Sequence, residues 1–372
     1  MKAQHLSRGT TSIVRTRKLL YVGPDYPGSN GTCFRDAFVR LGLDVATHDS
    51  EELLAPPASL YRKLALFVSK RPEPALVRRL NVQIIDLWDR FRPDIVFFIQ
   101  ARYVSAQTIR ELNSRSGTFA YMNDDMFNAA NQTFTFHQAI RELHCILTTK
   151  TYNVDEFKAA GGRAVYLPNA YDPQIHFPAQ PSAQEFERYC GDVAFIGTFR
   201  RERADFLALL AKDLVEHKLN VWGGGWHKMR RPYFPRARWR RLRQRLRGPE
   251  LWCAEMAKAI QSNKIMLGLL NHANRDRHTS RSLEIPACRG FMLAERTEEH
   301  QMLFEEDKEA VYFGTYEEMK DKINYYLRNE AHRVRIANAG YERCLKSPYT
   351  YEDRARSVLE EYSRMFQSRI NA

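Results

Sequence analysis

The sequence has few cysteines and no long apolar run, and each of these absences excludes a class of protein. Its six cysteines in 372 residues form no Cys-x-x-Cys pair and have no histidine at zinc-finger spacing. Neither a zinc module nor a disulfide framework is therefore predicted, and scattered reduced thiols are typical of cytosolic proteins. No segment reaches the roughly 18 apolar residues of a membrane helix, and the basic N-terminus lacks the apolar part of a signal peptide. We expect a cytoplasmic protein.

One segment lacks acidic residues altogether. The net charge is +13, but residues 228–247 (KMRRPYFPRARWRRLRQRLR) hold ten lysines and arginines and no aspartate or glutamate, which leaves +3 for the rest. Within the segment Trp239, Leu242 and Leu246 recur at a roughly helical spacing. A basic amphipathic helix with a tryptophan is typical of a peripheral anchor on an anionic membrane surface, here the inner face. A polyanionic acceptor or nucleic acid, and a solvated loop without a partner, are the alternatives.

The sequence does contain a repeated alternation of short apolar runs and helical patterns. Its length predicts two domains of ordinary size. Continuous apolar runs such as DIVFFIQ and KIMLGLL are typical of strands buried on both faces of a parallel sheet, and intervening helices predict right-handed crossovers. Helical patterns include residues 60–88, 236–247 and 248–263. The predicted division is a tail over 1–17, a domain over 18–170, a linker over 171–187, a second domain over 188–348 and a final helical segment over 349–372.

A phosphate site is predicted after the first strand of the second domain. In FIGTFRRER the strand ends at Gly197, and a short loop through Thr198 leads into a helix. Glycine permits a close approach of the backbone, a helix N-terminus attracts an anion, and Arg200 and Arg203 would supply bidentate donors. Solvated arginines on an ordinary strand–loop–helix unit are the alternative.

A sugar-binding carboxylate is predicted in RHTSRSLEIPACRG. Glu284 opens a short helix, and a carboxylate there can accept two hydroxyl hydrogens, as from a ribose. Ser280 and Ser282 are candidate N-caps, and Arg281 is expected to point toward the same cleft. Asp276 lies eight residues before Glu284. The alternative is a first-turn glutamate that only complements the helix dipole.

These motifs together resemble a known family. FIGTFRRER, NVWGGGW, AKAIQSNKIMLGLL, SRSLEIPACRGFMLAERTEEHQMLF and YTYEDRA make residues 192–356 similar to the C-terminal domain of the CgeB-like branch of the group 1 glycosyltransferases. LPNAYDP is similar to their interdomain linker. The resemblance implies an α/β GT-B fold, with two Rossmann-like domains whose parallel sheets face a central cleft. It also implies that the final helix, which carries one apolar stripe over residues 351–367, crosses back to the N-terminal domain.

The resemblance also implies roles for individual residues. Glu284 would bind the donor ribose, and Arg200 would help to hold the diphosphate near Gly197. Arginines and helix termini would stabilise the phosphates without a metal, and no cofactor is implied because the nucleotide diphosphate sugar is a substrate. The superfamily usually has a glutamate at the position of Asp276, and the surrounding NHANRDRHTS departs from the usual glycine-rich pattern.

The N-terminal domain is expected to supply the acceptor site. Ser29, Asn30 and Gly31 belong to a loop after the first strand, where they would face the cleft. Asp124 and Asp125 end a later strand, and a carboxylate there can orient or deprotonate an acceptor hydroxyl. A second candidate base, His137, lies in the following helical pattern. Turn chemistry, helix capping and surface placement are the structural alternatives.

The sequence therefore predicts a hexosyltransferase that uses a nucleotide diphosphate sugar. Its acceptor is unidentified and could be a glycan, a lipid-linked saccharide or a protein. One alternative is a catalytically inactive GT-B scaffold in cell- or spore-surface assembly. Another, less favoured, is a nucleic-acid-binding or nucleic-acid-modifying transferase, which the basic segment would serve.

Overall fold

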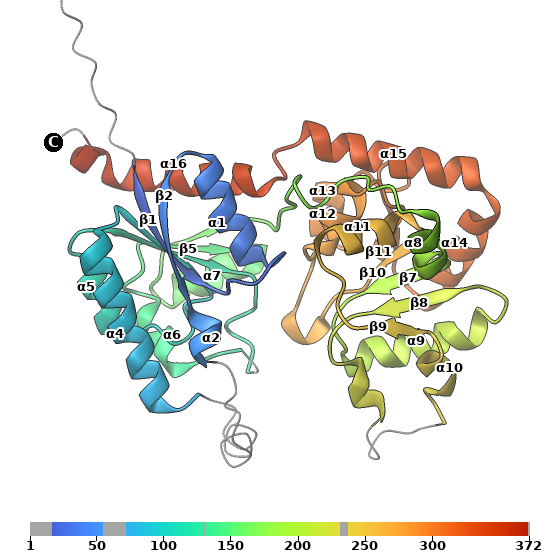
Figure 1. Cartoon of the computed structure of the whole chain (residues 1–372), viewed down its shortest axis with the longest axis horizontal. Helices are drawn as coiled ribbons and strands as arrows, with labels where there is room; N and C mark the ends of the chain where they lie inside the picture. The colour runs from blue at the N-terminus through green and yellow to red at the C-terminus, as the bar shows by residue number, and fades with distance from the viewer. Residues whose placement is uncertain (1–16, 55–71, 130, 231–236, 371–372) are drawn as a thin grey trace, which may run out of the picture.

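The computed structural model describes residues 17–54, 72–129, 131–230 and 237–370, which form two α/β domains side by side (Figure 1). Three predicted features lie wholly or partly outside the described residues: the tail up to residue 16, the helical pattern over 55–71, and residues 231–236 of the basic segment.

The described N-terminal domain is built on a parallel sheet of six strands in the order β2-β1-β3-β4-β5-β6. The strands are β1 (Lys18–Gly23), β2 (Asp44–Asp49), β3 (Ile95–Ile99), β4 (Gly117–Met122), β5 (Cys145–Thr148) and β6 (Ala164–Tyr166). The helices are α1 (Asn30–Arg40), α2 (Ser50–Leu54), α4 (Pro74–Phe91), α5 (Ala106–Leu112), α6 (Phe134–Ala139) and α7 (Thr151–Ala159). Every residue of β3 and β4 is buried, as their continuous apolar sequences predict for central parallel strands.

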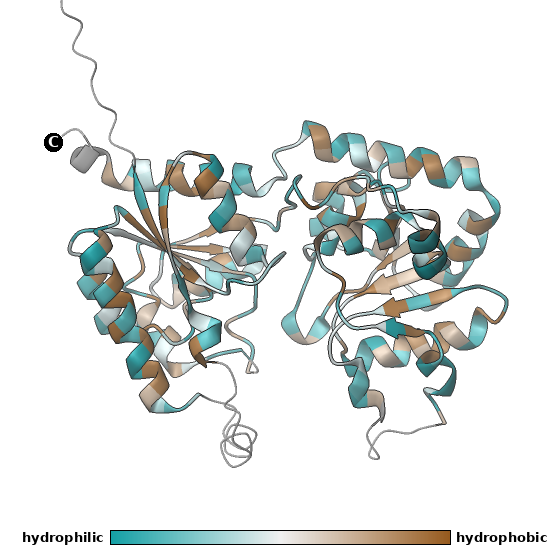
Figure 2. Ribbon diagram, in the orientation of Figure 1, coloured by the Kyte–Doolittle hydropathy of each residue, from teal (hydrophilic) through white to brown (hydrophobic). Residues whose placement is uncertain are grey.

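The described C-terminal domain repeats this architecture, with strands in the order β12-β11-β10-β7-β8-β9. They are β7 (Gly191–Ile196), β8 (Leu219–Trp222), β9 (Leu246–Gly248), β10 (Asn263–Gly268), β11 (Met292–Glu295) and β12 (Val311–Phe313). Its helices are α8 (Ala183–Tyr189), α9 (Arg201–Asp213), α10 (Arg240–Arg243), α11 (Cys253–Gln261), α12 (Arg281–Ala287), α13 (Glu298–Leu303), α14 (Tyr316–Arg328) and α15 (Glu330–Lys346), with 3-10 turns η1 (Trp226–Arg230) and η2 (His272–Asn274). Helices around both sheets carry bands of hydrophilic and hydrophobic residues (Figure 2), so each sheet is covered by amphipathic helices.

The described chain passes between the domains twice, once through the linker and once before the final helix. These two segments are hydrogen-bonded to each other. The backbone N–H of Tyr171, in the linker, donates to the carbonyl of Tyr349 (3.1 Å), and the N–H of Tyr351 donates to the carbonyl of Tyr171 (3.0 Å). After this contact α16 (Tyr351–Ile370) packs against α1 and β4 of the N-terminal domain, and its Ala355 and Val358 are fully buried there. Figure 1 shows α16 running along the N-terminal domain, while α15 covers the C-terminal one.

Three predicted boundaries differ from the structure. The helix expected from residue 248 begins at Cys253, because residues 246–248 pair with β8 as the edge strand β9. Helix α8 begins at Ala183, inside the predicted linker, because Ser182 and Glu185 form a capping box at its N-terminus. The helix expected over 236–247 is reduced to the four residues of α10.

The basic segment is joined to its own domain by its apolar residues. Trp239 is 1% exposed and Leu242 is fully buried, and both belong to the core beneath α9. The indole N–H of Trp239 donates to a carboxylate oxygen of Asp205 (3.0 Å). The predicted apolar edge therefore faces the C-terminal core, and exposed arginines remain on the outer side. Of the helices in the described part, none is both long and apolar enough to cross a membrane.

Candidate active site

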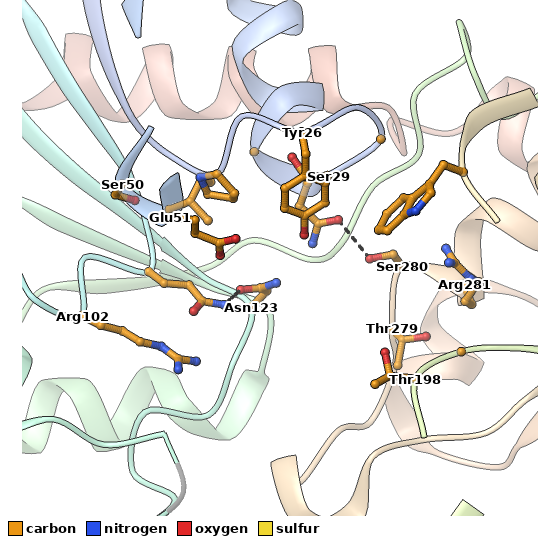
Figure 3. Close-up of a pocket in the computed structure, with 18 of the residues that line it drawn as sticks. Tyr26, Ser29, Ser50, Glu51, Arg102, Asn123, Thr198, Thr279, Ser280 and Arg281 are labelled. Carbon is orange, nitrogen blue, oxygen red and sulfur yellow. Dashed lines mark hydrogen bonds between the residues drawn. The ribbon is translucent and has the colours of Figure 1, made fainter. Parts of the chain in front are cut away.

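A cleft of about 630 Å³ lies between the two domains. It is bordered by the residues that follow β1, β3 and β4 on one side and by the ends of β7 and β10 on the other. Ligands bind at this end of open parallel sheets, because loops and helix N-termini converge there. Labelled in Figure 3 are Tyr26, Ser29, Ser50, Glu51, Arg102 and Asn123 from the N-terminal domain, and Thr198, Thr279, Ser280 and Arg281 from the C-terminal domain.

Gly197 and Thr198, in the loop after β7, line the cleft. Residues on the side of the loop away from the cleft hold it in place. The carbonyl oxygen of Gly197 accepts a hydrogen bond from the indole of Trp226 (2.9 Å). A Cβ atom on Gly223 would lie 2.0 Å from the same oxygen, so only glycine permits this close approach. The glycine loop of NVWGGGW thus supports the predicted phosphate loop and does not itself line the cleft.

The two predicted phosphate arginines have different surroundings. Arg203, in the first turn of α9, lines the cleft and donates to the carbonyls of Leu270 (3.0 Å) and Leu269 (2.9 Å). Burial lowers the pKa of the Arg203 guanidinium. Arg200 precedes α9, is exposed and does not line the cleft. Arg203 thus joins the end of β10 to the predicted phosphate loop.

Glu284 borders the cleft from α12 and is 4% exposed. One carboxylate oxygen pairs with the guanidinium of Arg281, and the other lies 3.5 Å from Nε2 of His176 in the linker. Arg281 also lines the cleft, as predicted from its place beside Glu284. A buried carboxylate next to the loop after β7 can accept hydroxyl hydrogens from a ligand in the cleft.

Ser282 does not have its predicted place in the cleft. It lies inside α12, is buried, and its hydroxyl oxygen accepts from the backbone N–H of Thr279 (3.0 Å) and contacts Nε2 of His300 (2.7 Å). Ser280 faces the cleft instead and donates to Asn30 Oδ1 (3.3 Å) across the domain boundary. The reason is helical geometry, since residues two apart on a helix point in different directions.

The N-terminus of α1 faces the cleft from the other domain. Ser29 is the N-cap, and its hydroxyl accepts from the backbone N–H of Thr32 (3.0 Å). Asn30 and Gly31 line the cleft beside it, as expected. A Cβ atom on Gly31 would lie 2.0 Å from the hydroxyl of Tyr21, which donates to the Pro24 carbonyl. The predicted acceptor loop is therefore held closely against β1.

A polar network continues this wall after β3 and β4. Gln100 donates to Asn123 Oδ1 (2.5 Å) and Asp124 Oδ2 (3.0 Å), and Arg102 pairs with Asp124. Gln100 has φ +63°, an uncommon conformation for a residue other than glycine that often occurs at functional sites. Asp124 does not itself line the cleft, but it holds two side chains that do.

Neither predicted catalytic residue lines the cleft. Asp125 is 0% exposed and accepts hydrogen bonds from Arg275, Asn153 and the N–H of Phe127. Burial pushes its pKa upward, but these bonds, above all from Arg275, hold the pKa below its ordinary value. His137 packs beside the ring of Phe127 (5.5 Å between centroids). The sequence placed Asp125 at a strand end and His137 in the following helical pattern, but it could not show that neither side chain lines the cleft.

Asp125 belongs instead to a polar contact between the domains, here termed the interdomain clasp. It joins residues 273–276 to the N-terminal domain. Asn274 Oδ1 accepts from the N–H of Asp125 (2.9 Å), and Arg275 bridges Asp125 and Glu156. Asp276 pairs with Lys150 at 2.8 Å, and both side chains are nearly buried. The residues that depart from the family pattern thus dock the two domains, and Asp276 does not line the cleft.

Sequence reasoning missed four large side chains of the cleft. Tyr26 and Trp252 come from opposite domains and meet edge to face, with ring centroids 5.4 Å apart. Glu51 and Arg102 line the N-terminal side. Tyr26 lies in the loop singled out after the first strand and Trp252 in the helical pattern predicted over 248–263, so both could have been proposed. Nothing in the local sequence distinguishes Glu51 or Arg102 from solvated surface charges.

Comparisons with known proteins agree with this architecture. A protein-family model described as "Glycosyl transferase-like" matches residues 200–360. The chain has the GT-B fold and carries a glycosyltransferase domain. Membership of the group 1 glycosyltransferases and of their CgeB-like branch stays a prediction. A sequence search of curated proteins finds no match.

Several solved GT-B structures are similar over nearly the whole chain. The Anabaena protein HepE, solved in complex with UDP-glucose, has a TM-score of 0.64 at 13% identity and covers 93% of this chain and 99% of its own. Sucrose-phosphate synthase from Thermosynechococcus elongatus has a TM-score of 0.67 at 12% identity, with 95% and 100% covered. A glycosyltransferase from Rickettsia africae has a TM-score of 0.63 at 10% identity, with 94% and 99% covered. At these identities the likeness concerns the fold.

Proposed function

We propose that this protein is a hexosyltransferase that moves a sugar from a nucleotide diphosphate sugar to an acceptor hydroxyl. The observation that carries the proposal is the buried carboxylate of Glu284 beside the loop after β7, in a cleft between two Rossmann-like domains. Glu284 would accept hydrogen bonds from the donor ribose. The diphosphate would lie between Gly197, Thr198, Arg203 and Arg281, which line the same wall.

The proposed chemistry uses the positive groups of that wall. The bond between the anomeric carbon and the phosphate oxygen breaks, the acceptor oxygen bonds to that carbon, and the hydroxyl proton is released. Negative charge then develops on the leaving diphosphate. Guanidinium groups and backbone N–H groups stabilise this charge more strongly in the transition state than in the ground state. Arg281 is better placed for this role than the exposed Arg200.

The acceptor would enter from the N-terminal wall. Ser29, Asn30 and Gln100 offer neutral hydrogen-bonding groups, and Glu51 offers a carboxylate. Such a surface suits hydroxylated acceptors. The proposed acceptor is therefore a glycan, a lipid-linked saccharide or a protein hydroxyl. The cleft position makes Glu51 a better candidate than Asp125 for orienting the acceptor hydroxyl.

The test is a thermal-shift screen followed by donor turnover. A bound nucleotide at about 100 times its Kd should stabilise the fold by about 2.7 kcal/mol, so UDP, GDP, ADP, dTDP and CMP are compared first. The corresponding sugar nucleotide is then incubated without acceptor, and release of free sugar is measured. Nucleotide binding without any hydrolysis or transfer would favour the inactive-scaffold alternative, and no binding of any nucleotide would contradict the proposal.

Metal-independent transfer is part of the proposal and has its own test. The cationic groups proposed for the diphosphate are arginines of the cleft wall. Activity in excess EDTA should therefore equal activity in added Mg²⁺ or Mn²⁺. Loss of turnover in EDTA that is restored by a divalent cation would contradict this part of the proposal.

We further propose that the basic segment 228–247 brings the enzyme to an anionic surface such as the inner face of a membrane. Because Trp239 and Leu242 are buried, attraction would come from exposed arginines, at about 1 kcal/mol each near an anionic leaflet and weakened by salt. Arg238, Arg240 and Arg241 are exposed in the described part of the segment.

A charge-matched comparison tests the membrane proposal. The triple variant Arg238→Gln, Arg240→Gln, Arg241→Gln should sediment less with vesicles containing anionic lipid than wild type does. A control with Arg328→Gln, Arg335→Gln and Arg356→Gln removes the same charge from exposed positions elsewhere and should sediment like wild type. Equal sedimentation of both variants would contradict specific docking, and salt-dependent retention on DNA only would favour the nucleic-acid alternative.

A further inference from the structure

The carboxylate of Glu284, in the C-terminal domain, contacts a histidine of the interdomain linker. His176 lies in the linker between β6 and α8, is 3% exposed, and has Nε2 3.5 Å from Glu284 Oε1. The other carboxylate oxygen, Oε2, pairs with Arg281. Glu284 thus has one neighbour on α12, Arg281, which also lines the cleft, and one on the linker, His176.

The orientation of the His176 ring follows from its other nitrogen. Nδ1 accepts a hydrogen bond from the backbone N–H of Asp172 (3.0 Å). A neutral imidazole that accepts at Nδ1 carries its proton on Nε2, and burial lowers the pKa of His176, which favours the neutral ring. The proton therefore lies on the nitrogen that faces Glu284.

The turn that carries His176 is itself fixed. The N–H of His176 donates to the Asp172 carbonyl (2.8 Å), and Asp172 accepts from Arg40 at the end of α1 (3.1 Å). Tyr171, which precedes Asp172, forms a parallel β-bridge with Thr350 just before α16. His176 is therefore held by elements of the N-terminal domain while its ring contacts a side chain of the C-terminal one.

We propose that His176 is a positioning residue for the donor. Its Nε2–H directs one oxygen of Glu284 so that the carboxylate faces the ribose hydroxyls in the cleft. In a buried site an N–H dipole acts on a carboxylate more strongly than it would in water. This inference rests on the proposed role of Glu284 in binding the ribose.

Two substitutions separate this role from a role in holding the linker. His176→Gln retains an amide N–H at the distance of Nε2, whereas His176→Asn retains an acceptor at the distance of Nδ1 for the N–H of Asp172. Binding is measured for UDP and for 2′,3′-dideoxy-UDP, which lacks the ribose hydroxyls. If UDP does not bind wild type, GDP and its dideoxy form replace the pair.

In wild type, UDP should bind more tightly than the dideoxy form. In His176→Asn this preference should fall about 10-fold, because the N–H dipole 3.5 Å from the carboxylate oxygen is lost, while His176→Gln should keep the preference within about 3-fold. The reverse order would show that the linker bond matters and would overturn the proposal. If the Asn variant does not fold, loss of the preference in a folded Gln variant overturns it equally.

Glu284→Gln shows which of the two claims fails. If this variant keeps the full preference for UDP over the dideoxy form, the ribose assignment of the proposed function is wrong. If Glu284→Gln loses the preference and His176→Asn keeps it, the proposed function stands and only the role of His176 is overturned.

Discussion

At the scale of single residues, the site depends on one carboxylate and on one glycine that no side chain can replace. Glu284 is buried between Arg281 and His176 and opens on the cleft. Gly223 carries no group toward the ligand but lies against the Gly197 carbonyl. The first would bind the donor directly, and the second would shape the loop that holds it.

We expect Glu284→Ala to abolish transfer while the protein stays folded. The variant removes the acceptor for the ribose hydroxyls and leaves Arg281 without its carboxylate partner, at a cost of about 1–3 kcal/mol to stability. Nucleotide affinity by calorimetry and the melting temperature are measured together. A variant that binds the nucleotide as tightly as wild type would contradict the assignment.

Gly223→Ala should weaken both the fold and donor binding. Its φ of +142° and the 2.0 Å approach to the Gly197 oxygen mean that a methyl group must displace the loop after β7, at a cost of about 1–3 kcal/mol or more. Gly42→Ala is the matched control, because Gly42 also has a positive φ (+85°) but no atom within 4 Å of the added Cβ. Denaturant unfolding should show a larger loss for Gly223→Ala, and nucleotide affinity should fall for that variant alone.

At the scale of elements, the strands were the most predictable part of the fold. Runs such as DIVFFIQ are apolar on both faces, and only a central parallel strand buries both. The edge strand β9 was not predicted, and the helix predicted over 236–247 is only as long as α10, because RWRRLRQRLRG has neither a strand alternation nor a long apolar stripe. The conformation of this segment depends on the packing of Trp239 and Leu242 against α9, which is a tertiary contact.

The difference between local sequence patterns and tertiary contacts also explains which site residues could be predicted. Gly197, Arg203, Arg281 and Glu284 follow strands in recognisable motifs, and all line the cleft. Asp125 follows a strand as well, yet its carboxylate pairs with Arg275, 150 positions along the chain. Sequence spacing can place a residue at a strand end, but the partner across the domain boundary decides where its side chain points.

The final helix has a testable energetic role. Val358 on α16 is fully buried against the N-terminal domain, whereas Arg356 is exposed on the same helix. Val358→Asp would bury a carboxylate among apolar side chains and should lower the free energy of unfolding by several kcal/mol. Arg356→Asp should change it by about 0.5 kcal/mol or less. Thermal unfolding compares the two, and equal melting temperatures would show that α16 adds little to the N-terminal core.

At the scale of the whole molecule, the interdomain clasp should couple the domains and make stability depend on pH. Arg275→Met leaves the buried Asp125 carboxylate without its main partner, at a cost of about 3 kcal/mol. Because the pKa of Asp125 is lowered in the folded state, its contribution is present above the unfolded-state pKa of about 4 and is lost as the pH falls through the lower folded-state value.

The clasp prediction is checked by denaturant unfolding between neutral and acidic pH. Asp125→Asn should reduce the acid-side slope, and Asp125→Asn with Arg275→Met should be more stable than Arg275→Met alone, because no buried charge is left unpaired. The exposed pair of Lys158 and Asp155 serves as control, since Lys158→Met should have little effect. An unchanged acid slope in Asp125→Asn would contradict the proposed coupling.

The return of α16 to the first domain also has a consequence for how the protein is made. Phe34 and Tyr121 in the N-terminal core pack with Tyr351 of α16, yet Tyr351 is synthesised roughly 230 residues after β4, or about 10–50 s later at ordinary elongation rates. Until then the face of the first domain that α16 covers has no partner. The N-terminal domain therefore completes its core only after the whole second domain has been translated, when α16 packs back onto it.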